Sequence, residues 1–137
     1  MNNLFNLSEA GYIAFHALLM LSQEENKVIN VREIANKTRA SEFHISKVMQ
    51  MLVKNNFISS TRGPQGGFKL IADPKKTYLS HIFELTEGKI SNCNCPFGKQ
   101  LCEFDRCPFD GFINKLGDEF IKYLTTRTLY EFINTEA

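Results

Sequence analysis

One stretch in the first half of the chain constrains the fold most, because two short helical patterns follow each other closely in it. Asn30 is a favourable N-cap and Glu33 completes a capping box, which predicts a helix over about 31–38. Ser41 is the expected N-cap of a second helix that runs to about Asn55. Its apolar residues repeat at i, i+3, i+4 and i+7: Ile45, Val48, Met49 and Leu52. Two short helices joined by a brief turn, the second amphipathic and basic, are typical of a helix-turn-helix.

A glycine-rich loop between two strand-like segments follows directly. Residues 57–61 and 68–71 have strand patterns, and residues 62–67 between them read Arg-Gly-Pro-Gln-Gly-Gly. A hairpin immediately after the second helix predicts the wing of a winged helix. The glycines let the backbone approach a phosphate or the minor-groove edge closely, and Arg62 supplies positive charge.

The flanking segments complete a predicted winged helix-turn-helix DNA-binding domain over residues 1–88. Ser8 is the expected cap of a helix over residues 8–22, which is apolar on most sides and therefore buried. Residues 79–87 form a short amphipathic helix that Gly88 stops. The fold class we expect is mainly α with a small β-hairpin, extended by a long C-terminal dimerisation helix.

The last part of the chain, residues 108–137, is predicted to hold that dimerisation helix and a short final helix. Pro108 suits the first turn of a helix. Apolar residues then repeat at helical spacing: Phe109, Phe112, Ile113, Leu116, Phe120, Tyr123 and Leu124. Thr128 and Glu131 form a second capping box, so we expect a break near 125–127. A helix lined with aromatic residues needs a partner surface, which is either its own domain or, as we expect, a second copy of the chain.

Positive charge is concentrated in the predicted DNA-binding domain. The whole chain has a formal net charge of +1. Between residues 27 and 69, however, eight Lys or Arg side chains stand against two acids, Glu33 and Glu42, so this segment is locally +6 and the remainder is net acidic. A basic segment beside an acidic remainder fits a protein that meets a phosphate backbone with one face.

Four cysteines fall within fifteen residues of the segment 89–107, namely Cys93, Cys95, Cys102 and Cys107. In a reducing compartment such a cluster indicates metal or redox chemistry rather than structural disulfides. Thiolates suit iron–sulfur clusters, Zn²⁺ and Cu(I). The spacing of the four is not that of a usual zinc ribbon. We therefore interpret residues 89–107 as a sensor loop.

Other classes of protein fit less well. The sequence contains no nucleophile elbow, no phosphate-binding loop with its lysine and no His-Glu-x-x-His motif, so we do not expect an enzyme. The apolar run from Ala10 to Leu21 is too short to span a bilayer and lacks the flanks of a signal peptide. We therefore expect a soluble, cytoplasmic protein without membrane contact. A winged helix that contacts only proteins is an alternative, which the locally basic segment disfavours.

Residues 34–71 resemble the Rrf-type winged-helix transcriptional regulators, the family of IscR, NsrR and CymR. The resemblance is strongest at 62–70, where the wing reads Arg-Gly-Pro-x-Gly-Gly-aromatic-x-Leu, and it extends over nearly the whole chain. It implies a homodimer that binds a double-stranded DNA operator. It places six residues at the DNA: Ser41, His44, Ser46 and Lys47 on the recognition helix, and Arg62 and Gly63 in the wing. Lys47 and Arg62 are suitable donors to phosphate or guanine.

The resemblance also bears on the cysteines. Cluster-binding members of the family carry three of them in this loop, which Cys102 and Cys107 match, with either Cys93 or Cys95 as the first. The fourth ligand in the family is often an acid near the start of the partner subunit's first helix, and its nearest equivalent here is Glu9. The additional thiol leaves an all-cysteine site open. We expect a [2Fe–2S] or [4Fe–4S] iron–sulfur cluster that senses iron, nitric oxide or redox state. The alternatives are cluster-free thiols that sense by oxidation and a bound zinc ion.

Overall fold

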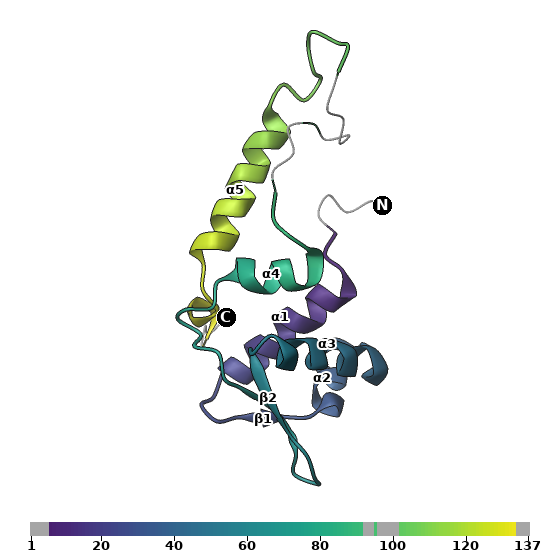
Figure 1. Ribbon diagram of the computed structural model, residues 1–137, viewed down its shortest axis with the longest axis vertical. Helices are drawn as coiled ribbons and strands as arrows, with labels where there is room; N and C mark the ends of the chain where they lie inside the picture. Colours follow the sequence, from purple (N-terminus) through teal and green to yellow (C-terminus); the bar gives the residue numbers. More distant parts are fainter. Residues whose placement is uncertain (1–5, 92–94, 96–101, 134–137) are drawn as a thin grey trace.

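The computed structural model describes residues 6–91, 95 and 102–133. Its helices are α1 (Glu9–Ser22), α2 (Val31–Thr38), α3 (Glu42–Lys54), α4 (Leu79–Glu87) and α5 (Phe112–Thr126), followed by the 3-10 helix η1 (Leu129–Phe132). Its strands are β1 (Val28–Ile29), β2 (Ile58–Thr61) and β3 (Gly67–Leu70). In Figure 1 the helices α1 to α4 and the strands form one domain, and α5 projects away from it. Within the described ranges, no helix has both the length and the apolar content that crossing a bilayer requires.

The wing hairpin belongs to a three-stranded antiparallel sheet in the order β1-β3-β2. Strand β2 pairs with β3 as predicted, with Ile58 opposite Leu70. Strand β1 pairs with the other edge of β3, with Ile29 opposite Phe68. The prediction contained the hairpin alone, because a two-residue strand is too short to show alternation. Buried Ile29 anchors β1 in the core, so β1 fixes the base of the wing.

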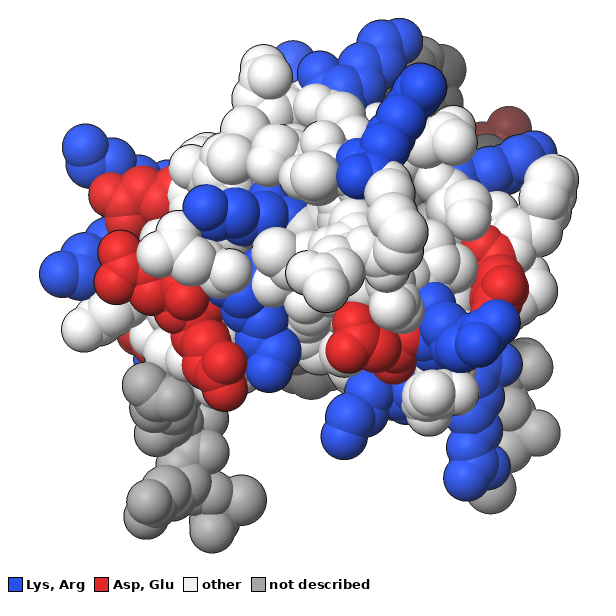
Figure 2. Space-filling view, turned by 90° about the horizontal axis from the view of Figure 1, so that it is seen from below, with Lys and Arg blue, Asp and Glu red and all other residues white. Residues whose placement is uncertain are grey.

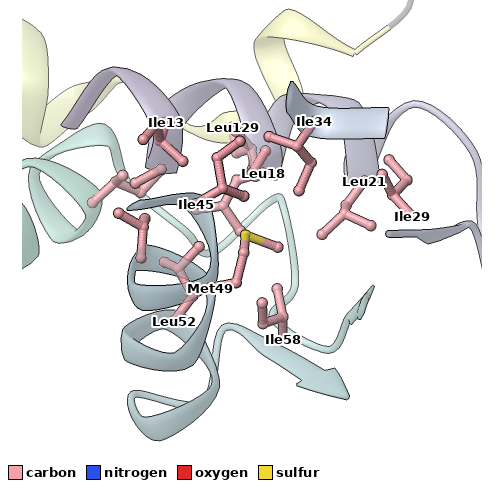
Figure 3. Packing of buried hydrophobic residues seen from close by; sticks show 14 residues of the cluster. Ile13, Leu18, Leu21, Ile29, Ile34, Ile45, Met49, Leu52, Ile58 and Leu129 are labelled. Carbon is pink, nitrogen blue, oxygen red and sulfur yellow. The ribbon is translucent and has the colours of Figure 1, made fainter. Parts of the chain in front are cut away.

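The core lies around α1, which contacts α2, α3, α4, β3 and η1. Figure 3 shows side chains from the first three helices, β1, β2 and η1 packed together: Ile13, Leu18 and Leu21 of α1, Ile29 of β1, Ile34 of α2, Ile45, Met49 and Leu52 of α3, Ile58 of β2 and Leu129 of η1. All of them are almost completely buried. The predicted burial of the first helix and of one face of the recognition helix is therefore confirmed. Each such side chain contributes about 1.5–3 kcal/mol through burial.

The predicted N-caps place the first three helices correctly. The hydroxyl oxygen of Ser8 caps α1. In the capping box of α2, the side chain of Asn30 accepts from the Glu33 N–H at 2.9 Å, and the Asn30 N–H donates to the Glu33 carboxylate at 2.8 Å. The hydroxyl oxygen of Ser41 accepts from the His44 N–H at 3.1 Å and so begins α3. These local bonds satisfy N–H groups that the helices leave unpaired.

The start of α5 differs from the prediction. We expected the helix from about Pro108, but α5 begins at Phe112. Asp110 and Gly111 have φ angles of 45° and 75°, in the left-handed region, which a right-handed helix does not include. The expected break is confirmed, because α5 ends at Thr126. Proline at a first helical turn is therefore not enough to place the start of this helix.

The short final helix ties the end of α5 to the domain formed by α1 to α4 and the sheet. Thr128 and Glu131 form the predicted capping box, in which the Thr128 N–H donates to the Glu131 carboxylate at 2.7 Å. The next N–H, that of Leu129, donates to the carbonyl of Thr77 at 2.9 Å. The side chain of Leu129 is completely buried in the domain core. This residue therefore links the projecting helix to the domain.

Replacing Leu129 by alanine is expected to lower the free energy of unfolding by about 2–5 kcal/mol, because it leaves a cavity in a packed core. Tyr130→Ala, at the exposed neighbouring position, is the control and should cost less than about 1 kcal/mol. Urea denaturation at one fixed protein concentration measures both changes. Equal effects of the two substitutions would contradict the anchoring role of Leu129.

Candidate DNA interface and cysteine segment

Helix α3 turns one face to the core and the opposite face to solvent. At about 100° per residue, positions 43, 47, 50 and 54 fall within about 60° of one another. They hold Phe43, Lys47, Gln50 and Lys54, and all four side chains are exposed. The buried side chains of α3 lie on the opposite face. We call these four residues the α3 stripe.

The predicted DNA contacts of α3 lie on this stripe or close to it. Lys47 is part of the stripe, and its Nζ lies 4.6 Å from the centroid of the Phe43 ring. Ser46 is half-buried at one edge. Ser41 precedes the helix and is exposed, and although its oxygen caps α3, its O–H hydrogen is available for a further acceptor. Three hydrogen-bond donors thus lie along the first turns of the helix.

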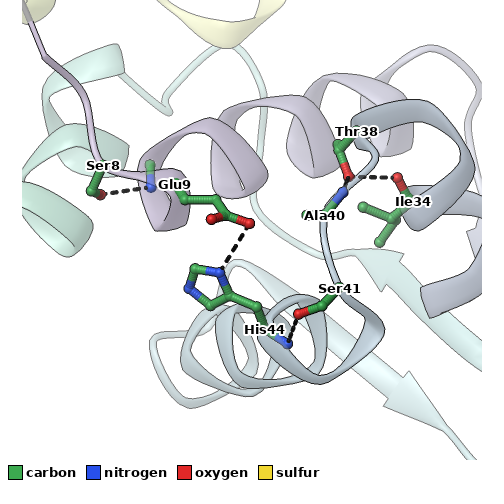
Figure 4. A network of polar contacts seen from close by, with 8 residues as sticks. Ser8, Glu9, Ile34, Thr38, Ala40, Ser41 and His44 are labelled. Carbon is green, nitrogen blue, oxygen red and sulfur yellow. Dashed lines mark hydrogen bonds and ion pairs between the residues drawn. The ribbon is translucent and has the colours of Figure 1, made fainter.

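His44 lies at the other edge and is turned toward α1 (Figure 4). Its Nδ1 is 3.3 Å from Oε1 of Glu9, so the two form an ion pair when the imidazole is protonated. Glu9 is the first residue of α1 and the predicted alternative ligand from the partner subunit. Here it lies beside the recognition helix of its own chain, with a side chain that is 57% exposed. The structure therefore brings two of the predicted site residues together, in a pair that the sequence analysis did not foresee.

The turn between α2 and α3 is held by Thr38, which is buried. Its hydroxyl donates to the carbonyl of Ile34 at 2.8 Å and accepts from the N–H of Ala40 at 3.3 Å (Figure 4). The intervening Arg39 is left-handed, with a φ of 60°, and redirects the chain. These bonds fix the direction in which α3 leaves α2, and with it the direction of the α3 stripe.

The wing ends in a tight turn beside Arg62, whose side chain is exposed. The Gly66 N–H donates to the carbonyl of Gly63 at 2.9 Å and closes this turn. Gly63 has a φ of 111° and open space where a side chain would stand. A Cβ added to Gly66 would collide with the carbonyl oxygen of Thr61. The two glycines are therefore needed for the shape of the turn, and they leave its backbone accessible to a ligand.

The end of the molecule that carries the wing is seen face-on in Figure 2. Lys and Arg side chains are spread over this face, with uncharged surface between them and separate groups of acidic side chains. One acid, Glu42, faces Arg32 at 3.9 Å and partly offsets its charge. The local excess of positive charge in the sequence therefore forms a dispersed pattern rather than one continuous basic patch.

Residues 102–107, the end of the cysteine segment that the structure describes without gaps, lie at the opposite end of the molecule from the wing (Figure 1). Cys102 and Cys107 are exposed free thiols, and Cys95 is half-buried. Cys93 lies outside the described residues. Among the residues whose positions are described, no three His, Cys, Asp or Glu side chains meet as a metal site. The described thiols are thus chemically suited to a metal or cluster, but they do not form a ready-made cage.

A polar contact joins the start of α1 to the helix that precedes the cysteine segment. The N–H and the hydroxyl of Ser8 donate to Oε1 of Glu87 at 3.1 and 2.6 Å. Gly11 lies against the same carboxylate, so a side chain at this position would displace the Glu87 carboxylate. Glu87 ends α4, and Glu9 next to Ser8 faces the recognition helix. A short chain of contacts therefore leads from the base of the cysteine segment to α3.

The sequence analysis missed Phe43 and Gln50 as members of the exposed face of α3. Their positions relative to Lys47, at i−4 and i+3, were visible in the sequence as a stripe opposite the apolar one. A phenylalanine on the solvent face of an amphipathic helix departs from the pattern, and that departure is the signal that could have identified it.

Comparison with known proteins places the chain in a family. The family model described as "Rrf2: Iron-dependent Transcriptional regulator" matches residues 7–135. The transcriptional regulator NsrR of Geobacillus kaustophilus is 26% identical over 127 residues, which cover 90% of this chain and 86% of NsrR. IscR of Escherichia coli O1:K1 is 25% identical over 132 residues, which cover 95% of this chain and 81% of IscR. Two other relatives match over only 52% and 50% of their own lengths.

Solved structures share the fold. CymR, the global cysteine regulator of B. subtilis, superposes with a TM-score of 0.78 at 20% identity, over 98% of this chain and 100% of that one. IscR of T. potens superposes with a TM-score of 0.63 at 22% identity, over 93% and 85%. The family and these relatives are transcriptional regulators and not enzymes, as the sequence predicts for this chain. The chain has the winged-helix fold, and the family model matches nearly its whole length. It therefore belongs to the Rrf2 family of transcriptional regulators.

Proposed function

We propose that this chain is a homodimeric regulator that binds double-stranded operator DNA through the α3 stripe and the wing. We further propose that an iron–sulfur cluster, held by cysteines of segment 89–107, controls its operator affinity. The observation that carries the proposal is the placement of two donor-bearing elements, α3 and the wing, away from residues 102–107, which lie at the other end of the molecule. The wing end is therefore suited to binding DNA, and the cysteine end to sensing a signal.

The side chains at the DNA end have the required chemistry. Lys47 and Arg62 are exposed and present charged donors for phosphate or guanine. The hydroxyls of Ser41 and Ser46 are suited to phosphate or base edges, and the bare backbone at Gly63 permits close approach in the minor groove. His44, paired with Glu9, lies at the margin of this surface.

The projecting helix α5 supports a dimer. Ile113, Phe120 and Leu124 lie on the side toward the domain, where the Phe120 ring packs edge-on against Phe83 of α4. On a different face, exposed apolar residues follow at i, i+4 and i+11: Phe112, Leu116 and Tyr123. The lower end of this face adjoins an apolar hollow of about 230 Å³ lined by Phe15, Leu19, Leu79, Tyr123, Leu129 and Phe132. A second copy of the chain is the partner we propose for this surface, because two-fold pairing would also present two recognition helices.

The cluster would be held by Cys102 and Cys107, with Cys93 or Cys95 as a third ligand. The fourth position would be taken by the remaining cysteine or by Glu9 of the partner subunit. Exposed free thiols suit this role, because thiolates are the usual protein ligands of iron–sulfur clusters. A bound cluster supplies a group that responds to iron supply, nitric oxide or redox state. The description of the family as iron-dependent, and the similarity to NsrR and IscR, support this choice.

Binding of a random-sequence duplex tests the DNA interface. In such non-specific binding both side chains would contact phosphate. Replacing Lys47 or Arg62 by alanine should therefore make the fall of log affinity with log salt less steep by about 1.8, because each dimer would lose two phosphate contacts. Lys122→Ala, on the exposed surface of α5, should leave the slope unchanged. Fluorescence anisotropy over a range of salt concentrations measures the slopes. Undetectable binding by the unmodified protein would instead favour a winged helix that contacts only proteins.

A second candidate function is regulation by thiol oxidation without a cluster. Cys102 and Cys107 are exposed and five residues apart, which suits thiol chemistry as well as ligation. CymR, which shares the fold, is a cysteine regulator, and an oxidized form of S. aureus CymR superposes with a TM-score of 0.76. The visible absorption of protein purified without oxygen separates this candidate, and a zinc site, from a cluster.

A further inference from the structure

Phe43 is a large apolar side chain placed where a polar one is expected. It is 72% exposed, although it lies in the first turn of a helix whose other apolar residues face the core. Its neighbours on the α3 stripe are Lys47, Gln50 and Lys54, which are all polar. Covering the ring with a partner would remove apolar surface from water and so favour binding. A partner that covers this position would meet both an apolar ring and a cationic neighbour.

We propose that Phe43 is a specificity-determining residue that contacts the C5-methyl group of a thymine in the major groove. The inference rests on the proposed DNA-binding function and adds a base preference to it. The N-terminal turns of a recognition helix face the base edges, and Phe43 is the second residue of α3. The thymine methyl is the apolar group that base pairs present in the major groove, and apolar side chains contact it.

The contact with Lys47 gives the ring a second role. The Lys47 ammonium lies 4.6 Å from the ring centroid, within the range of a cation–π interaction. The ring therefore restrains the flexible lysine on the same face of the helix. With Phe43 against a thymine methyl, the restrained ammonium would stand beside a neighbouring base pair, where guanine N7 and O6 are its best acceptors. Phe43 thus contributes one contact and positions a second.

The experiment begins with a duplex site selected by the unmodified protein from a random-sequence library. Each thymine of that site is then replaced in turn by deoxyuridine, which removes the C5-methyl group alone. We expect one thymine in each half-site at which the replacement weakens binding about fourfold. Phe43→Ala should bind thymine and deoxyuridine duplexes equally at that position, whereas Phe43→Leu, which keeps an apolar side chain, should retain part of the difference.

The control is Phe104→Ala, which removes another highly exposed phenylalanine, 80% exposed, from the segment at the far end of the molecule. It should leave the difference between thymine and deoxyuridine unchanged. The inference is overturned if no thymine of the selected site is sensitive to its methyl group, or if Phe43→Ala keeps the full sensitivity. Neither result contradicts the proposed DNA-binding function. That function is contradicted only if the unmodified protein shows no salt-dependent binding and selects no site.

Discussion

Replacing Leu116 by lysine is expected to convert the proposed dimer into monomers and to weaken binding to a site with two half-sites at least about 100-fold. Leu116 is exposed in the middle of the apolar face of α5, between Phe112 and Tyr123. In a two-fold dimer this face is covered by a second copy, so the substitution would bury an unpaired ammonium group at the interface. Loss of the dimer removes the gain in affinity that comes from linking two binding events, which typically amounts to about 10²–10⁴-fold.

Two measurements separate loss of the dimer from loss of the folded structure. Analytical ultracentrifugation should show a monomer for Leu116→Lys and a dimer for Lys122→Ala, which changes an exposed residue of the same helix without adding charge to the apolar face. Binding to a duplex with a single half-site should change less than about threefold, because each recognition helix is intact. Phe112→Lys is a second variant with the same expectation. A dimer that persists in both lysine variants would show that the second copy does not cover this face.

The parts of the fold that could be predicted are those set by local chemistry. The capping box of Asn30 and Glu33 and the apolar repeat of α3 follow from bonds and spacings within one helix, and both were predicted correctly. Strand β1 was not predicted, because it exists only through its pairing with distant β3. The start of α5 was misplaced, because Pro108 permits a helical turn while the left-handed backbone at Asp110 and Gly111 ends it.

The candidate site shows the same division. Lys47 and Arg62 were predicted from their chemistry and from the family resemblance, and the structure leaves both exposed at the wing end of the molecule. The pairing of His44 with Glu9 could not be predicted, because the two residues belong to helices that meet only in the tertiary fold. Phe43 was overlooked for another reason. An apolar residue in a helix is normally assigned to the core, and only the angular position relative to Lys47 reveals that it faces solvent.

Replacing Cys102 or Cys107 by alanine is expected to abolish the visible absorption of protein purified without oxygen. The unmodified protein should be brown, with a broad visible band and matching amounts of iron and sulfide. Each of these thiols is proposed as a ligand, and a cluster that loses a thiolate ligand loses the charge and the bond that retain its iron. Replacing Cys93 and Cys95 one at a time then distinguishes a site of three cysteines and another ligand from a site of four cysteines. Loss of the band in one variant indicates three cysteines with another ligand, and loss in both indicates four.

The spacing of the four cysteines cannot replace that spectrum, because the same thiols could serve all three alternatives. A colourless protein, even after incubation with iron and sulfide, would exclude the cluster and leave two cases. Stoichiometric zinc would identify a metal site, which a chelator should empty. A metal-free protein whose DNA affinity changes with oxidant, and whose response disappears in Cys102→Ala and Cys107→Ala, would identify a thiol sensor. In every case the residues proposed to contact DNA are the same, because Lys47 lies in α3 and Arg62 in the wing, and neither segment contains a cysteine.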